Sequence, residues 1–310
     1  MTSELPSPDE VRGYLTELSN WGRWGRDDQR GTINLITARK RVEAAQLVRT
    51  GRTVSLGRPL ATVPGPRNPQ PAVQFWTRSP IRRGGHAGDF LGVQSHGHAT
   101  THLDALCHVW DENGIYNGRD PEETIEIGGA NFGAIDAWSD GIVTRGVMLD
   151  VPRHRGSAFV AQNEPVHGWE LEAILVEREI ELRPGDALVV NCGREAWQEA
   201  NPDRPYGHYN NAEGISEAPG LHASCLPFLR KYDVGVLVWD MLDAKPFGYD
   251  VTWTIHGAIH AFGLAILDNA LTEPLAVACL EQGQDEFMIF VSPLVLERGT
   301  SSPVNPIAVF

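Results

Sequence analysis

Residues 96–108 read His-Gly-His-Ala-Thr-Thr-His-Leu-Asp-Ala-Leu-Cys-His, and this stretch holds four of the chain's 11 histidines together with one aspartate. Its internal spacing is His98-x-x-x-His102-x-Asp104-x-x-x-His108. Imidazole nitrogens and a carboxylate oxygen are ligands that suit zinc, manganese or ferrous iron. The stretch therefore predicts a metal centre. The alternative is that these histidines serve singly as helix caps, core donors or surface groups.

Two local geometries are compatible with this spacing. On a helix His98 and His102 share a face as i and i+4, whereas on an extended strand His102 and Asp104 share a face as i and i+2. A bend between the two conformations brings all three side chains onto one ion. His108 is then either a further ligand or a proton-transfer group beside the ion. We expect His98, His102 and Asp104 to be ligands.

The run 101–108, Thr-His-Leu-Asp-Ala-Leu-Cys-His, resembles the signature His-x-Gly-Thr-His-x-Asp-x-Pro-x-His of the cyclase family of metal-dependent hydrolases. Kynurenine formamidase and isatin hydrolase are known activities of that family. Thr100 stands where glycine is usual and Leu106 where proline is usual, and Tyr116-Asn117-Gly118 follows as in the family's longer branch. The resemblance implies a homodimer or homotetramer, and it implies that His108 is the general base. If His108 is instead a ligand, His222 and His260 are the next candidates for the base.

A second group of candidate ligands lies far along the chain. The resembled family has a histidine that opens a helix and a glutamate 12 residues later, and His256 and Asp268 reproduce that interval with aspartate in place of glutamate. A second ion would use Asp104 as a bridge to His256 and Asp268, so the cofactor is one or two divalent ions, zinc or manganese, per subunit. His260 would lie on the same helix face as His256 and support a ligand from behind.

Composition excludes several classes of partner. With 26 basic and 40 acidic residues the formal net charge is -14, which disfavours binding to nucleic acid or to an anionic membrane surface. No apolar run approaches the length of a membrane span, and the N-terminal residues lack a secretory pattern. The four cysteines form no CxxC pair, which fits a reducing cytoplasm. We expect a cytoplasmic protein whose partners are a small-molecule substrate and copies of itself.

The remaining pattern predicts one α/β domain over residues 51–310, with a mixed sheet flanked by helices, preceded by an N-terminal arm over residues 1–50. The resemblance implies the swivelling β/β/α type of this fold. Residues 201–219 have no period and read as a long surface loop. The predicted helices span residues 8–18, 38–49, 169–178, 219–231, 256–264 and 273–280. The predicted strands span residues 53–56, 73–77, 90–93, 143–151, 187–191, 234–239, 266–269 and 287–291.

The predicted activity is hydrolysis of an amide, lactam or lactone bond in a small aromatic or cyclic substrate by metal-activated water. The candidate substrate-binding residues are Trp24, Phe75, Trp76 and His222, although the aromatic ones also suit core packing. No Gly-x-Ser-x-Gly elbow, Rossmann fingerprint or P-loop competes with this reading. The alternatives are a ring-forming cyclase or dehydratase on the same site, and a metal-dependent binding protein without turnover.

Overall fold

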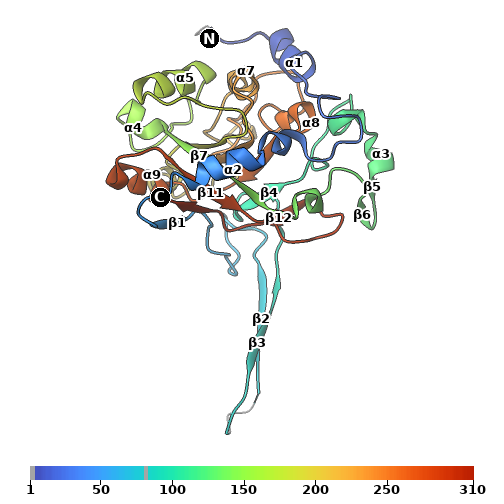
Figure 1. The fold of residues 1–310 in the computed structure, drawn as a ribbon, viewed down its shortest axis with the longest axis vertical. Coiled ribbons are helices and arrows are strands. Elements are labelled where there is room, and N and C mark those ends of the chain that lie inside the picture. Colours follow the sequence, from blue (N-terminus) through green and yellow to red (C-terminus); the bar gives the residue numbers. More distant parts are fainter. Residues whose placement is uncertain (1–3, 80–82) are drawn as a thin grey trace.

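The computed structural model describes residues 4–79 and 83–310, and its framework is a mixed β-sheet (Figure 1). Within that part of the chain the sheet has nine strands in the order β1-β13-β11-β7-β8-β9-β10-β4-β12. β7, β8, β9 and β10 run parallel at the centre, and the flanking pairs are antiparallel. The strands are β1 Thr53–Ser55, β4 His102–Asp104, β7 Ile142–Asp150, β8 Ala187–Asn191, β9 Val236–Trp239, β10 Ala265–Asp268, β11 Glu286–Val291, β12 Ser301–Pro303 and β13 Ile307–Val309.

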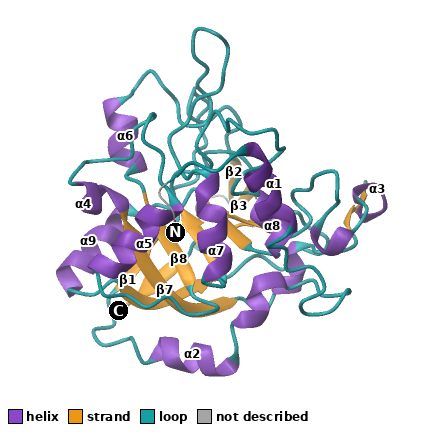
Figure 2. Ribbon diagram, turned by 90° about the horizontal axis from the view of Figure 1, so that it is seen from above, coloured by secondary structure: helices purple, strands orange, loops and turns teal. Residues whose placement is uncertain are grey.

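Helices cover both faces of this sheet. They are α1 Pro8–Thr16, α2 Ala38–Ala45, α3 Pro121–Thr124, α4 Val151–Arg155, α5 Gly168–Glu177, α6 Arg194–Ala200, α7 Leu226–Lys231, α8 Gly257–Phe262 and α9 Glu273–Gln282. Short 3₁₀ helices span Gly31–Leu35, Tyr116–Gly118, Ile135–Trp138 and Ala223–Cys225. Figure 2 shows α2 on one side of the sheet and α5, α7 and α8 on the other. Every residue of β8, β9 and β10 is buried, as expected for parallel strands covered on both faces.

The predicted α/β class and mixed sheet are confirmed, and most predicted elements differ from the observed ones by a few residues at their ends. The helix predicted from residue 219 is the clearest difference, because its first regular turn begins only at Ala223. The backbone before it is held extended: Leu221 N–H donates to Leu242 O at 2.8 Å and His222 N–H donates to Val166 O at 2.9 Å. These long-range bonds leave residues 219–222 unable to join the helix.

The strands predicted near residues 73–77 and 90–93 are present but lie outside the main sheet. β2 (Val73–Arg78) and β3 (Ala87–Gly92) form an antiparallel hairpin that projects from the body as an arm (Figure 1). A second small hairpin pairs β5 (Ile125–Glu126) with β6 (Gly129–Ala130). The strand that precedes the histidine stretch is therefore not part of the main sheet, because β3 pairs with β2 alone among the described strands.

The N-terminal segment packs onto the domain. Trp21 Nε1 donates to His260 O at 2.6 Å, and Thr32 Oγ1 donates to Gly235 O at 2.7 Å. Thr37 caps α2, since its side chain accepts a hydrogen bond from Lys40 N–H. Residues of this segment thus contribute to the same core as the central sheet.

The four cysteines are free and buried. Among the helices of the described residues, none is both long and apolar enough to cross a membrane.

Candidate metal centre

Two neighbouring strands place three of the predicted ligands on one face of the sheet. β4 carries His102 and Asp104 as i and i+2, so both side chains point the same way. β10 pairs with β4 antiparallel, and its Asp268 lies directly opposite His102. Directly opposite residues of an antiparallel pair share a face. The extended geometry of the histidine stretch is therefore the one that the structure adopts.

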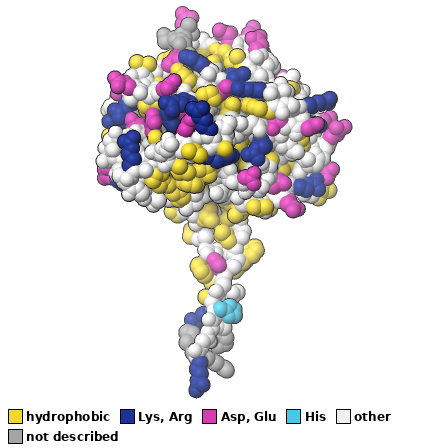
Figure 3. Space-filling view, viewed as in Figure 1, with side chains coloured by type: hydrophobic (Ala, Val, Ile, Leu, Met, Phe, Trp, Pro, Cys, Tyr) yellow, Lys and Arg dark blue, Asp and Glu magenta, His cyan; other side chains and the backbone are white. Residues whose placement is uncertain are grey.

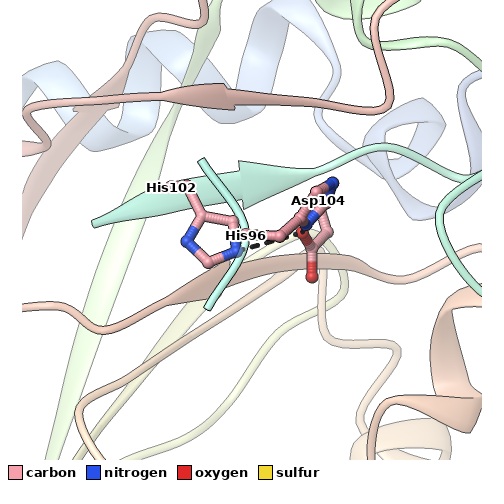
Figure 4. Close-up of side chains that lie close together, drawn as sticks. All are labelled: His96, His102 and Asp104. Carbon is pink, nitrogen blue, oxygen red and sulfur yellow. Dashed lines mark ion pairs between the residues drawn. The ribbon is translucent and has the colours of Figure 1, made fainter. Parts of the chain in front are cut away.

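The first group of potential ligands comprises His96, His102 and Asp104 (Figure 4). Asp104 Oδ1 lies 3.1 Å from His96 Nδ1 and 3.3 Å from His102 Nε2. Both oxygens of Asp104, together with His96 Nδ1, are buried and make no hydrogen bond within the described part of the protein. Buried polar atoms normally have a partner. A divalent cation coordinated by these atoms would provide one.

The second group shares Asp104 and adds His256 and Asp268. Asp104 Oδ2, the oxygen that faces away from the first group, lies 3.9 Å from His256 Nε2. His256 Nε2 is also 3.2 Å from Asp268 Oδ2, so the shorter aspartate side chain reaches the cluster. Asp104 thus presents one oxygen to each group, which is the arrangement of a carboxylate that bridges two positions.

Surrounding residues fix how these side chains face the cluster. His102 Nδ1 pairs with Thr100 O at 2.9 Å, and His96 Nε2 pairs with Thr300 Oγ1 at 3.1 Å. Trp239 Nε1 donates to Asp268 Oδ1 at 2.6 Å. His256 Nδ1 is bonded to Asp243 Oδ2, a carboxylate–histidine pair typical of metal sites. In each imidazole the other nitrogen is left to face the cluster.

The electrostatics of the cluster also suit a cation. Burial opposes the charged form of Asp104, yet the adjacent His108 and His102 hold the pKa of its carboxyl well below the usual range. Burial likewise opposes protonation of His102, but the negative charge of Asp104 raises the pKa of His102 to about 9. The pKa of His256 is raised because Asp243 and Asp268 outweigh its burial. The negative charge of the carboxylates thus favours a nearby positive charge. A divalent ion would supply it, and the imidazoles that hold the ion would then be neutral.

His98 faces another part of the site and belongs to neither group. Gly97 adopts φ +120°, a conformation that glycine tolerates and other residues rarely adopt. The backbone turns at this residue, so that the side chains of His96 and His98 point in different directions. The His98 ring lies edge-on to Tyr206 and His208, at centroid distances of 5.8 and 5.0 Å. An added Cβ at Gly207 would lie 2.3 Å from His98 Cδ2, so the ring is closely packed there. The structure thus puts His96 where the spacing predicts His98.

His108 lies beside the cluster without being part of either group. Its ring stacks on His96 with a centroid distance of 3.7 Å, and its Nε2 is 3.9 Å from Asp104 Oδ1. Burial lowers the pKa of His108 to about 4, with the charges of His96 and His256 acting in the same direction against that of Asp104. The imidazole is therefore neutral near pH 7, with Nε2 able to accept a proton.

A cavity of about 260 Å³ opens onto this cluster. Its lining combines His96, His98, His102, His108, His256 and Asp268 with Tyr206, Leu242, Lys245, Phe247 and Trp253. The four predicted substrate-binding residues lie elsewhere. Phe75 and Trp76 are on the arm and are 62% and 75% exposed, Trp24 contacts the Arg23 guanidinium, and His222 is hydrogen-bonded to Tyr249. The sequence pattern of a strand or loop does not reveal which cavity, if any, its side chains line.

Sequence reasoning missed several residues of this site. His96 is inside the histidine stretch, yet the spacing alone does not separate it from His98 before the turn at Gly97 is known. Asp243 lies 13 residues before His256 in a segment without a motif. Lys245, Phe247 and Trp253 follow in the same segment and reach the cavity through the fold of that loop.

Comparison with known proteins places the chain in a family. Residues 46–246 match the family model described as "Putative cyclase". A crystal structure described as that of a novel cyclase is 28% identical, covers 94% of this chain and 100% of its own, and superposes with a TM-score of 0.77. A comparison with curated protein sequences finds no match.

Two isatin hydrolase structures share the fold at lower identity. Isatin hydrolase A from Ralstonia solanacearum is 16% identical, with coverage of 84% and 92% and a TM-score of 0.56. An isatin hydrolase bound to the product analogue thioisatinate is 14% identical, with coverage of 88% and 98% and a TM-score of 0.56. The family match spans more than half of the sequence and agrees with the resemblance of the histidine stretch. The chain therefore belongs to this cyclase family.

Proposed function

We propose that this protein is a metal-dependent hydrolase that opens an amide, lactam or lactone bond of a small aromatic or cyclic substrate. The observation that carries the proposal is Asp104, a buried carboxylate without hydrogen-bond partners that belongs to both groups of candidate ligands. The other four members of these groups line a cavity. His96, His102 and Asp104 would hold one ion, and His256 and Asp268 would join Asp104 in holding a second.

A divalent ion bound there would activate a water molecule for attack and polarise the substrate carbonyl. His108 Nε2 lies 3.9 Å from Asp104 Oδ1, and its neutral imidazole would accept the proton from that water. The same nitrogen would then return the proton to the leaving nitrogen or oxygen, so that a single residue would serve as base and acid. Asp243 holds His256 by Nδ1 and keeps its Nε2 directed at Asp268 and Asp104.

Two other functions use the same residues. Ring closure with loss of water is the reverse of lactam or lactone hydrolysis and would pass through the same groups. A binding protein without turnover would need the ligands but would have no use for a neutral histidine that stacks on a ligand and is not itself in either group. His108 therefore favours catalysis over binding alone.

The test begins with metal content and continues with substrates. We expect one or two ions per subunit, and turnover of at least one compound from a panel of N-formyl aromatic amines, cyclic imides, isatin and lactones. Chelation should abolish turnover, and zinc or manganese should restore it. A protein that holds a stoichiometric ion but opens none of these compounds would instead favour a binding function.

A matched pair of variants tests the ligand assignment. His96→Ala should lower metal affinity by more than about 100-fold, since even loss of an outer partner of a ligand costs about 10- to 100-fold. His98→Ala should keep the ion, because the His98 ring packs on Tyr206 and His208. Metal content after dialysis measures both. Retention of the ion by His96→Ala and its loss from His98→Ala would reverse the assignment.

We also propose that the protein is a homo-oligomer whose copies cover the β2–β3 arm. Phe75, Trp76, Phe90 and Leu91 are each at least half exposed on this hairpin, and Phe75 and Phe90 stack on each other at 6.0 Å. Figure 3 shows apolar side chains along the upper part of the projecting arm. A two-stranded hairpin is marginally stable alone in water, so a second copy packing against it would stabilise it.

Light scattering should give a dimer or tetramer of the 34.1 kDa chain at micromolar concentration. Replacing both Phe75 and Trp76 by serine should shift the population towards monomer, because most of the arm's aromatic surface is removed. Val176→Ser on α5, a residue 76% exposed, is the matched control and should leave the mass unchanged. A monomeric wild-type protein would exclude this assembly.

A further inference from the structure

We propose that Lys245 binds an anionic group of the substrate, so that the enzyme acts on small aromatic amides or lactams that carry a carboxylate away from the bond being opened. This inference rests on the proposed function, because it names the substrate class of the same cavity. It assigns Lys245 a role in substrate specificity, separate from the residues that hold the ion.

Lys245 stands out by charge among the groups that face the cavity. In the described part of the lining it is the one lysine or arginine, and no carboxylate there lies within ion-pairing distance of its ammonium. Asp243, the acidic lining residue nearest in sequence, is already hydrogen-bonded through both of its oxygens. Its Oδ1 accepts from Thr254 Oγ1 and Ile255 N–H, and its Oδ2 is bonded to His256 Nδ1. An ammonium without a counter-ion in a cavity is suited to binding an anion from solution.

The backbone holds Lys245 at this position. Its N–H donates to Ala218 O at 2.8 Å, and its carbonyl accepts from Gln162 Nε2 at 2.7 Å. Ala218 also lines the cavity, so the two segments meet at the wall. Only the side chain of Lys245 is therefore free to move. Ordering one side chain on binding costs less conformational entropy than ordering a mobile loop.

The positive region extends behind the same wall. Lys245 and His98 both line the cavity. Burial lowers the pKa of His98 and of His208, and the charges of Arg194 and Lys245 act in the same direction on both. The buried Arg194 guanidinium lies behind these histidines and donates to His98 O and to Asn269 Oδ1. The ion-binding groups, by contrast, cluster around Asp104. The cavity lining thus combines imidazoles and a carboxylate of the candidate metal cluster with an unpaired cation at Lys245.

Aromatic side chains also line the cavity, with Tyr206 beside His98 and Trp253 beside His256. Tyr206 uses its hydroxyl to donate to Pro219 O and to accept from Leu242 N–H, so it offers its ring to the cavity. Trp253 is held by its Nε1, which donates to Trp110 O at 3.1 Å, and its ring lies 5.9 Å from that of His256. Phe247 completes the apolar wall. A flat ring would pack here with its carbonyl at the ion and its carboxylate at Lys245.

The test compares two probes that differ in one group, 4-formamidobenzoate and the neutral 4-formamidobenzamide. Metal-loaded wild-type protein should bind the carboxylate more tightly in calorimetry and, if it opens both, should show the lower KM for it. Lys245→Met should weaken binding of the carboxylate by about 10- to 100-fold, the usual effect of losing one charged hydrogen bond. Binding of the carboxamide should change by less than about threefold, and kcat should change little for either probe.

Matched variants separate charge from structure. Lys245→Arg should restore most of the preference for the carboxylate probe. Lys231→Met removes an exposed lysine of α7 that pairs with Glu172 of α5, and it should leave the preference unchanged. Metal content must be equal in all variants. Equal binding of the two probes by wild type, or a carboxylate preference that survives in Lys245→Met, would overturn the inference. The second result would mean that the ion itself binds the carboxylate.

The binding measurement also keeps this inference separate from the proposed function. A preference that depends on Lys245 without turnover of either probe would support the anion site and count against hydrolysis of formamides. Turnover of both probes with equal efficiency in wild type and Lys245→Met would support hydrolysis and overturn the anion site.

Discussion

Asp104→Asn is expected to release the bound ion and to abolish turnover. The substitution keeps the volume of the side chain and removes its charge, and Asp104 is the one residue common to both groups of candidate ligands among the described residues. One oxygen of Asp104 lies near His96 of the first group and the other lies near His256 of the second group. No neighbouring side chain would take over both positions in the variant. Metal affinity should fall by well over about 100-fold, which exceeds the effect of losing an outer partner.

Metal content after dialysis and thermal unfolding measure this result. An ion at about 1,000 times its dissociation constant stabilises the folded wild-type protein by about 4 kcal/mol, and this stabilisation should be lost on chelation. Asp104→Asn should unfold at the same temperature with and without the ion. Asp203→Asn, which changes an exposed aspartate in the 201–219 loop, is the control and should behave as wild type. A stoichiometric ion in Asp104→Asn would place the metal site elsewhere.

His108→Asn is expected to keep the ion and to lower kcat by about 10²- to 10⁴-fold, the usual contribution of a positioned acid–base group. The reason is its position: His108 stacks on His96 and faces Asp104, yet it is in neither group of candidate ligands. Metal content and kcat must be measured on the same preparation. His154→Asn, at an ion pair with Glu177, is the matched control.

The pH dependence of kcat tests whether His108 is the general base. Because burial lowers the pKa of His108 to about 4, the imidazole is neutral and accepts a proton above that pH, and it loses this ability as the pH falls through about 4. The corresponding acidic limb should disappear in His108→Asn. A limb near pH 7 that persists in the variant belongs to the activated water, which titrates at about that pH in zinc enzymes.

Loss of the ion from His108→Asn would contradict this role and make His108 a ligand. The base would then be another histidine of the cavity. Of the two alternatives that the sequence suggests, His222 is bonded to Tyr249 and His260 packs near Asp111, and neither lines the cavity among the described residues. His98 lines it, although burial and the charges of Arg194 and Lys245 lower its pKa to about 3.

Sequence alone determined the features that depend on spacing within one element. His102 and Asp104 share a face because a strand repeats every two residues, and β8 and β9 are buried strands because they are continuous apolar runs. The family could also be predicted from the histidine stretch, because ligand spacing on one strand is a local property. The interval from His256 to Asp268 likewise indicated a second group of ligands.

Only the tertiary structure decided how these local faces meet. Pairing of β10 with β4 places Asp268 opposite His102, and such a register depends on packing across more than 160 residues of sequence. The turn at Gly97 assigns His96 to the cluster and His98 to the cavity wall, and the folds of the loops bring Asp243 and Lys245 to the site. The path of a loop leaves no hydrophobic periodicity in its sequence and cannot be predicted from it. That path is set by long-range hydrogen bonds and by the surfaces against which the loop packs.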